Sequence, residues 1–191
     1  MSYGAAEPRR HRLTVEDYYR MGEVGIFKPD ARVELIDGEI IDMPPIGHRH
    51  AAIVDKLAEL LIKAVEGRSI VRTQGPIALG RHSEPLPDLA LLKPRADGYF
   101  DAHPRPGDVL LVIEVADTSL RFDRDVKTPL YAKHDVPEVW VIAVEDRRVT
   151  RYRDPLRRAY RRVDEPDLRA PLEVAALSAV RIDLSALFPS S

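Results

Sequence analysis

The hydrophobic residues of the chain occur mostly in short runs that are bounded by Pro, Gly and Asp. Short apolar or alternating runs between such residues are typical of strands. They predict strands over residues 32–36, 39–43, 69–73, 77–79, 88–92, 110–116, 138–144 and 180–184, and a hairpin over residues 147–163. Asp37 and Gly38 separate the first two strands, and an Asp-Gly pair in that place favours a tight hairpin turn.

Two segments show the residue spacing of helices. Thr14 has the side chain of an N-cap residue and precedes a predicted helix over residues 15–21. Residues 50–66 carry an apolar stripe that would face a core, and Gly67 ends this helix. The stripe consists of Ile53, Leu57, Leu60, Leu61 and Val65.

The order of helix, strands, helix and strand predicts an α+β or α/β sandwich with a mixed sheet. With 191 residues the chain has the length of one domain, which would bury roughly 70% of the unfolded surface. We therefore expect a single domain over residues 1–191, in which residues 1–12 are loosely structured because they are small, polar and basic.

The composition narrows the classes of function. The chain has no cysteine, which excludes disulfides, thiolate zinc sites and cysteine nucleophiles. No apolar stretch approaches the length of a membrane span, and the N-terminus lacks a signal-peptide core, so we expect a cytoplasmic protein. The net charge is −2 and the pI is about 6.3, so nucleic-acid binding would require a local basic patch.

Two acidic residues stand out at the ends of apolar runs. Asp88 opens one predicted strand, and Glu114 lies late in another. If the chain between them folds back as an antiparallel pair centred near Asp101, the two acids face each other with Cβ atoms roughly 5 Å apart. Carboxylates at that distance repel unless a proton or a cation lies between them, and a hard divalent cation prefers such oxygen ligands.

The alternative is that both acids are solvated strand ends in an unrelated register. The long connection over residues 93–109 can contain bulges that change the register. Glu114 favours a functional pair, because it interrupts a seven-residue apolar run and burying a bare carboxylate there costs many kcal/mol.

Lys127 is a third candidate. It follows Glu114 by thirteen residues, beyond a turn that would bring the chain back over the sheet, in a short helical stretch after Ser119. A lysine beside two carboxylates and a metal could orient a water nucleophile or stabilise a pentavalent phosphorane. The alternative is an ordinary solvated lysine. Pro129 lacks a backbone N–H, so the helix either starts at Thr128 or bends there.

At these residues the chain resembles the Uma family of the PD-(D/E)XK, restriction-endonuclease-like superfamily. The resemblance covers roughly residues 12–155 and is carried by an ordered set of motifs. They are Glu34–Glu39, the helix at His50, Pro87-Asp88, Glu114-Val115, Asp117-Thr118-Ser119, Asp123, Lys127, Tyr131-Ala132 and Val136–Ile142.

The resemblance implies a four-stranded mixed sheet flanked by helices and phosphodiester cleavage of DNA that depends on a divalent metal, Mg²⁺ or Mn²⁺. Asp88 matches the motif aspartate, Glu114 matches the second motif acid, and Glu34 matches an upstream acid that could add a metal ligand. The superfamily lysine would follow Glu114 by two residues, where this chain has Ala116. In the Uma pattern this lysine has moved to the next helix, as Lys127.

Other polar residues allow two interpretations each. His48 and His50 could form a metal pair, but they precede a helix and lack a third ligand, so we expect His50 to face the site and His48 to be exposed. Gln74 could approach the metal region, although a surface role is more usual. Ser119 could be a nucleophile, but it has no His–Asp pair nearby in the sequence, which favours a cap or turn role shared with Thr118.

The stretch over residues 147–162 holds eight arginines, with Tyr152 and Tyr160 between them. Arginine binds phosphate and tyrosine stacks on bases, so this stretch could contact nucleic acid. The residues concerned are Arg147, Arg148, Arg151 and Arg153. The alternative is a solvent-facing hairpin, with Asp146 and Asp154 as local partners.

The leading hypothesis is a metal-dependent endonuclease that cuts DNA with Asp88, Glu114 and Lys127. The other is an inactive domain of the same fold that binds nucleic acid or a protein partner, which the missing lysine at position 116 favours. We also expect a homodimer, because a two-fold dimer presents one site to each strand of a duplex. The strands after Asp146 would form the dimer interface or a flap that faces DNA.

Overall fold

The computed structural model describes residues 9–189, so most of the expected loose segment, residues 1–8, lies outside the described residues. Residues 9–12 form neither helix nor strand, and Arg12 Nε donates to the Asp37 carbonyl oxygen at 2.8 Å. Across the described range, every helix is too short or too polar to span a bilayer.

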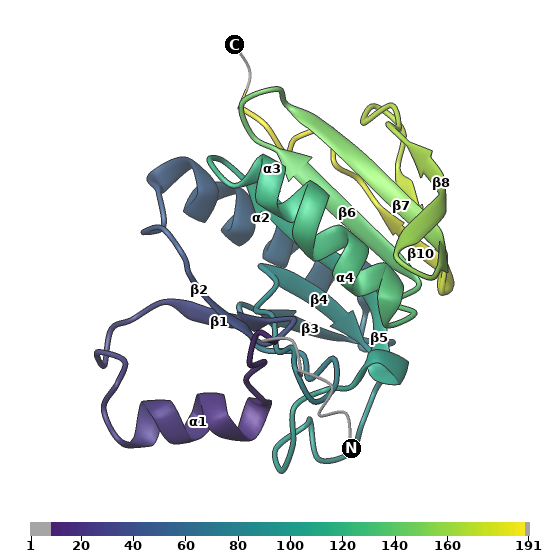
Figure 1. Cartoon of the computed structure of the whole chain (residues 1–191). Helices are drawn as coiled ribbons and strands as arrows, with labels where there is room; N and C mark the ends of the chain where they lie inside the picture. Colours follow the sequence, from purple (N-terminus) through teal and green to yellow (C-terminus); the bar gives the residue numbers. More distant parts are fainter. Residues whose placement is uncertain (1–8, 190–191) are drawn as a thin grey trace, which may run out of the picture.

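A mixed six-stranded sheet with the order β3-β4-β5-β6-β7-β8 forms the centre of an α+β fold (Figure 1). Its strands are β3 (Ile70–Thr73), β4 (Leu89–Leu92), β5 (Val109–Ala116), β6 (Glu138–Ala143), β7 (Arg148–Leu156) and β8 (Ala159–Asp164). The pair β5–β6 is parallel, and the other neighbours are antiparallel. The predicted mixed sheet and α+β class are confirmed, and the four strands that the resemblance implied become six.

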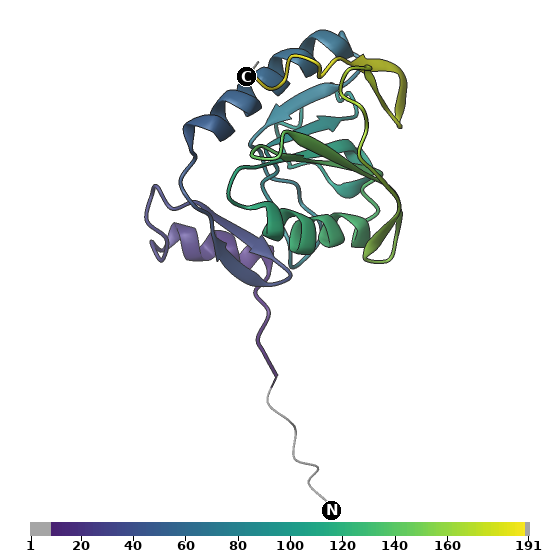
Figure 2. The ribbon, with the colours of Figure 1, turned by 90° about the horizontal axis from the view of Figure 1, so that it is seen from above.

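Helices cover both faces of this sheet (Figure 2). One face carries α2 (His48–Val65), and the other carries a continuous helical segment of three parts. Its parts are α3 (Leu120–Phe122), the π-helical turn η2 (Asp123–Lys127) and α4 (Thr128–Lys133). Helix α1 (Val15–Glu23), the 3₁₀ turn η1 (Pro106–Asp108) and two hairpins lie outside these layers. The hairpins are β1 (Val33–Ile36) with β2 (Glu39–Asp42) and β9 (Leu172–Val174) with β10 (Leu177–Ile182).

The core lies on both faces of the sheet because side chains of a strand alternate between them. Leu111, Ile113 and Trp140 belong to the apolar cluster under α2. Val112 and Val139 belong to the opposite cluster, which includes Leu130 and Tyr131 of α4. Glu114 follows Val112 by two residues in β5 and therefore shares its face, on the side of α4.

The predicted register between the acidic strands is confirmed. Leu89 pairs with Ile113 and Ala90 with Val112, which extends to Asp88 opposite Glu114. A shift in the register lies further along, between Leu91 and Leu92, at the far end from the two acids. The bulge that the long connection allowed therefore exists, but Asp88 and Glu114 remain opposite each other.

One predicted strand is absent, and several predicted element boundaries differ by one to three residues. Ile77 and Leu79 are buried, but residues 77–79 form no strand. The backbone N–H groups of Ile77 and Leu79 donate to a facing loop at 3.0 Å each, and the prolines in that loop lack the N–H groups that a ladder needs. The last strand is β10, which begins before Val180, ends before Leu184 and pairs with the unpredicted β9. Helix α2 begins at His48, two residues before the predicted start.

Candidate active site

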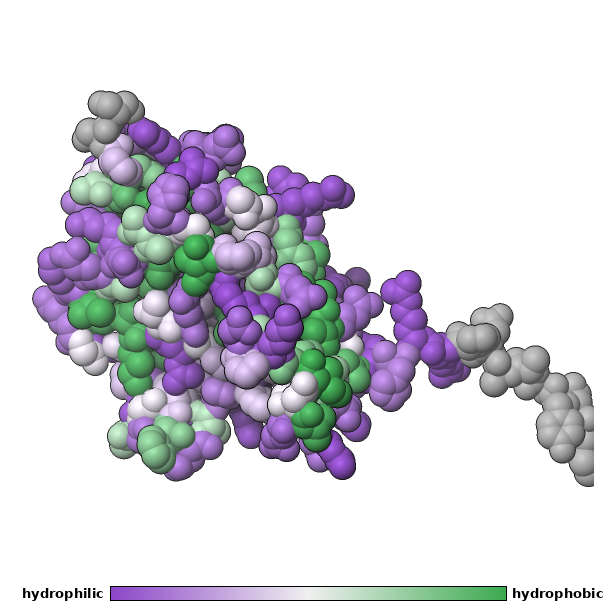
Figure 3. Space-filling model, turned by 90° about the vertical axis from the view of Figure 1, so that its left-hand side faces the viewer, coloured by the Kyte–Doolittle hydropathy of each residue, from purple (hydrophilic) through white to green (hydrophobic). Residues whose placement is uncertain are grey.

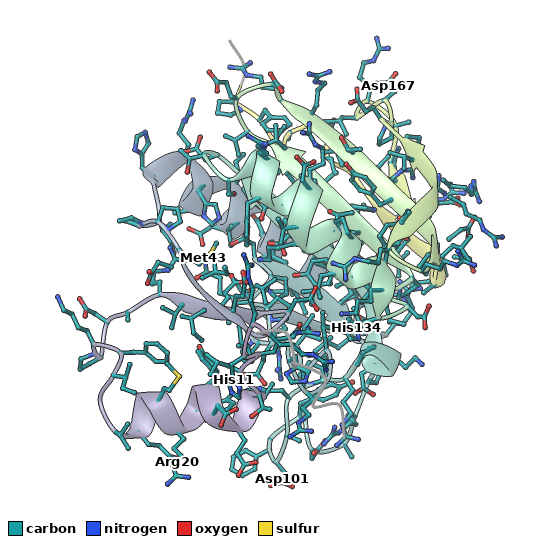
Figure 4. All side chains as sticks on the ribbon, in the orientation of Figure 1. His11, Arg20, Met43, Asp101, His134 and Asp167 are labelled. Carbon is teal, nitrogen blue, oxygen red and sulfur yellow. The ribbon has the colours of Figure 1, made fainter. Side chains whose placement is uncertain are left out.

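A cavity of about 120 Å³ opens where β5 ends and where β4 and α2 begin, beside the loop that follows β2. Met43 of that loop lines it and lies between the β1–β2 hairpin and the helices (Figure 4). Five predicted residues also line it, from five different segments of the chain: Glu34, His50, Asp88, Glu114 and Lys127. The fold thus brings together side chains that are distant in the sequence.

Glu114 and Lys127 form a buried ion pair in this cavity. Lys127 Nζ lies 2.9 Å from Glu114 Oε1, and the two side chains are 1% and 2% exposed, respectively. Tyr131 donates its hydroxyl to the same oxygen at 2.6 Å. The alternative of a solvated Lys127 is therefore wrong. Although burial opposes its charge, Glu114 and Glu34 raise the pKa of Lys127, so that the ammonium stays protonated.

Glu34 is the second acid on Lys127. Its Oε2 lies 3.3 Å from Lys127 Nζ, and Lys127 also donates to the Leu86 carbonyl oxygen at 3.2 Å. Apart from this ion pair, Glu34 Oε2 is buried and accepts no hydrogen bond. Burial raises the pKa of Glu114 well above its usual value; Lys127 opposes this rise, and the neighbouring acids add to it. Burial therefore favours a protonated Glu114, and the ammonium of Lys127 is the group that opposes this.

Asp88 is held by two contacts at the end of the acidic strand pair. Its Oδ2 accepts a hydrogen bond from Val115 N at 2.8 Å, and its Oδ1 lies 3.0 Å from His50 Nε2. The hydrogen bond to Asp88 raises the pKa of His50 despite partial burial. The expectation that His50 faces the site while His48 is exposed agrees with this arrangement.

Asp123 also lines the cavity, although sequence reasoning gave it no role in the site. It is buried, accepts a hydrogen bond from the Ser119 hydroxyl, and has its pKa raised by burial. Ser119 occupies the N-cap position of α3, as the cap or turn interpretation expected, but its hydroxyl donates to Asp123 and forms no capping hydrogen bond. The sequence did contain a pattern that could have identified Asp123 as a site residue. Asp123, Lys127 and Tyr131 are spaced by four residues, and residues at that spacing share one helix face.

The topology explains how these helical residues reach the site. Strands β5 and β6 are parallel, so the chain must cross over a face of the sheet to connect them. The crossover passes through the π-helical turn, where Thr128 N donates to the Asp123 carbonyl oxygen, five residues back. Pro129, which has no N–H, follows this turn, so the helix runs through Thr128 and departs from α geometry just before the proline.

Other predicted residues lie elsewhere. The Gln74 side chain is exposed and does not line the cavity, whereas its backbone N–H donates to the Asp88 carbonyl oxygen at 2.9 Å. Arg151 and Arg153 both donate to Asp164, and Arg148 lies near Asp146 and Glu165. The solvent-facing alternative named Asp146 as a partner, which agrees with Arg148, whereas Arg151 and Arg153 are only 15% and 18% exposed and pair with Asp164.

The residue types at the cavity suit a hard divalent cation. Glu34, Asp88, Glu114 and Asp123 supply carboxylate oxygens, the ligands that Mg²⁺ and Mn²⁺ prefer. Within residues 9–189, however, no three His, Asp or Glu side chains form a group that could hold a metal ion as they stand. The ammonium of Lys127 lies between Glu34 and Glu114 instead.

Comparisons with known proteins agree with this picture. A family model named Uma2, with the description "Putative restriction endonuclease", matches residues 15–185. A crystal structure described as a putative nuclease belonging to DUF820, from Anabaena variabilis, has a TM-score of 0.68 at 17% identity, over 92% of this chain and 97% of that chain. At this identity the likeness shows the fold alone. No curated protein matches the chain.

Proposed function

Since the chain belongs to the Uma2 family, we propose that it is a nuclease that hydrolyses phosphodiester bonds of DNA with the help of Mg²⁺ or Mn²⁺. The observation that supports this most is the buried group of Lys127, Glu114 and Glu34 beside Asp88. Buried ion pairs contribute little to stability compared with apolar packing, and perturbed acids in a cavity are typical of functional sites.

Asp88 and Glu114 would hold the cation, with Glu34 or Asp123 as a further ligand. When bound, the ion would polarise the scissile phosphate and lower the pKa of a water molecule. In the hydrolysis, the water loses a proton to solvent, its oxygen bonds to phosphorus, one P–O ester bond breaks, and the leaving oxygen takes up a proton from solvent. Lys127 would stabilise the negative charge that develops on the phosphate oxygens.

Neighbouring side chains hold these groups in place. Tyr131 fixes Glu114 through its hydroxyl, and the Val115 N–H and His50 fix the two oxygens of Asp88. Such contacts limit the positions that these side chains can adopt and therefore the rearrangement that binding of a cation requires.

The test is cleavage of plasmid and single-stranded DNA with Mg²⁺, Mn²⁺ or Ca²⁺. Asp88→Asn should reduce the rate by about 10²-fold or more, because it removes a charge at the reacting centre. Asp101→Asn is the matched control, since Asp101 is exposed and lies away from Met43 and the cavity (Figure 4). If Asp88→Asn cuts as fast as the wild type, the assignment is wrong.

A second candidate is an inactive domain that binds nucleic acid or a protein partner. Ala116 in the place of the superfamily lysine and the lack of a ready three-ligand group in the described chain favour it. Calorimetry separates the two candidates. A nuclease should release or absorb heat on Mg²⁺ or Mn²⁺ addition, and this heat should vanish in Asp88→Asn/Glu114→Gln; an inactive domain should show no such heat.

A further inference from the structure

A second cavity, of about 570 Å³, adjoins the N-terminal half of α2. It lies between that helix, the turn from β6 to β7 and the segment that follows β10. Figures 1 and 2 show this last segment passing beside α2 and ending near that turn. Asp88, Glu114 and Lys127 are not among the residues that line this cavity.

The lining combines an apolar floor with a basic rim. Ile53, Val144 and Leu187 are buried at the floor, and the ring of Phe188 is half-buried beside them. Four nitrogen-bearing side chains stand around the floor, whereas Glu145 is the single acid among the lining residues. The four are His48, Arg49, Lys56 and Arg147. A purely apolar ligand would contact the apolar floor but would form no electrostatic interaction with the basic side chains of the rim.

The cavity adjoins the candidate active site. His48 and Arg49 line it, while Gly47 and His50, in the same turn of α2, line the active-site cavity. Arg49 Nη2 lies 2.6 Å from Asp117 Oδ1, and Asp117 lines the active-site cavity three residues after Glu114. A strand with its phosphate at Asp88 could therefore place a neighbouring nucleotide in the second cavity.

The face seen from the left of Figure 1 carries separate hydrophobic groups on a predominantly hydrophilic surface (Figure 3). An occupant with both a flat apolar part and an anionic part suits such a surface. A nucleobase can stack on an aromatic ring, and a phosphate can share cations that already have carboxylate partners. Lys56 and Glu59 form an exposed and therefore weak pair, and Arg49, which pairs with the less exposed Asp117, is itself 52% exposed.

We propose that this cavity is a nucleotide-binding subsite, which receives one base of the substrate strand over Phe188 and its phosphate among Arg49, Lys56 and Arg147. The proposal rests on the proposed function for the nature of the ligand, because it takes nucleic acid as the substrate. The subsite predicts that one nucleotide near the scissile phosphate is recognised through its base, which the hydrolytic site alone does not predict.

The test measures binding without cleavage. Full-length Asp88→Asn is titrated against labelled single-stranded oligonucleotides of about 15 nucleotides, each with one abasic residue at a successive position, and anisotropy gives the Kd. One abasic position should weaken binding by about fivefold or more, as expected for the loss of one stacked base. Adding Phe188→Ala should weaken binding of the intact oligonucleotide equally and remove the dependence on that position.

Three further variants make the result specific. Phe188→Trp keeps a stacking ring and should keep the abasic profile. Lys56→Glu should weaken binding and reduce its dependence on salt, because it removes a phosphate contact. Phe100→Ala is the matched control, since Phe100 is 89% exposed and does not line the cavity, and it should change nothing.

Two outcomes would overturn the proposal. One is an abasic profile that Phe188→Ala leaves unchanged while binding persists, which would leave the nuclease assignment intact. The other is a change of oligomeric state in Phe188→Ala by light scattering with unchanged DNA binding, which would identify a protein interface. Conversely, a Phe188-dependent profile in a wild type that never cuts DNA would support the subsite and contradict hydrolysis.

Discussion

Lys127 compensates the buried negative charge of the candidate site, because Glu114, Glu34 and Asp123 all raise its pKa. Lys127→Met should leave these acids without their cation and lower the free energy of unfolding at neutral pH by about 3–5 kcal/mol. Urea denaturation measures this change. The double variant Lys127→Met/Glu114→Gln should recover part of the loss, since it removes one of the uncompensated charges.

Lys133→Met is the matched control for that experiment. Lys133 also pairs with an acid, Asp37, but both side chains are about a third exposed. Such a pair contributes at most about 1 kcal/mol. Equal losses in the two lysine variants would show that Lys127 is not the essential counter-charge.

The hydrogen bond between His50 and Asp88 should depend on pH, because it involves the titratable imidazole of His50. The hydrogen bond to Asp88 raises the pKa of His50 above the usual 6.5 in the folded state. The stabilisation by this bond is therefore complete below the unfolded-state pKa and is lost as the pH rises through the folded-state pKa. NMR titration of the imidazole should show the raised pKa in the wild type and a lower one in Asp88→Asn.

Metal binding should change the same titration. If Mg²⁺ binds Asp88, its charge opposes protonation of His50, and the pKa of His50 should fall when Mg²⁺ is added. His134, which lies outside the cavity lining and has its pKa lowered by burial, provides an internal reference that should not respond. A His50 pKa that is insensitive to both Asp88→Asn and Mg²⁺ would contradict the arrangement at the site.

At the scale of elements, α1 depends on its first turn, because none of its residues is buried. Thr14 Oγ1 accepts from Asp17 N at 3.1 Å, and Asp17 Oδ2 accepts from Thr14 N at 2.9 Å, which together form a capping box. Thr14→Ala should cost about 1 kcal/mol and accelerate amide hydrogen exchange within α1. The exposed Ser178→Ala should have no comparable effect, and unchanged exchange in Thr14→Ala would contradict a role of the cap.

Elements whose signals are local could be predicted from the sequence. The Thr14 cap, the Asp37-Gly38 turn and the apolar stripe of α2 each depend on neighbouring residues, and the structure contains all three. The register between β4 and β5 was also predictable, since apolar runs bounded by breakers allow few alignments. The place of Lys127, thirteen residues after Glu114, made it a candidate, and the family resemblance then favoured it over an ordinary solvated lysine.

Features that depend on distant residues could not be predicted in the same way. Asp123 became a site residue only through the crossover that folds it over Glu114. The pairing of Arg151 and Arg153 with Asp164 depends on the register of β7 with β8. The failure at residues 77–79 has the same origin, because the apolar pattern is present but the facing prolines prevent a ladder.

At the scale of the whole molecule, the homodimer stays a prediction. In the described sheet β8 is an outer strand, and the exposed Leu156 and Val163 lie on the β7–β8 hairpin. Light scattering at micromolar concentration should show a dimer that Leu156→Lys/Val163→Lys converts to a monomer. Ile62→Lys is the control, because Ile62 is equally exposed but lies on α2. A monomeric wild type that nicks plasmids would contradict the dimer and leave the site assignment intact.

The contact of Lys127 with Glu34 joins residues that are 93 positions apart. Contacts of such long sequence separation form late in folding, because the intervening loop must first be closed. While the chain leaves the ribosome, Glu34 and Asp88 emerge well before Lys127, and all three acids emerge before the strand β6 that anchors its helical segment. A nascent or partly unfolded chain therefore has no complete site, and a protein of this design can attack nucleic acid only after its synthesis and folding have finished.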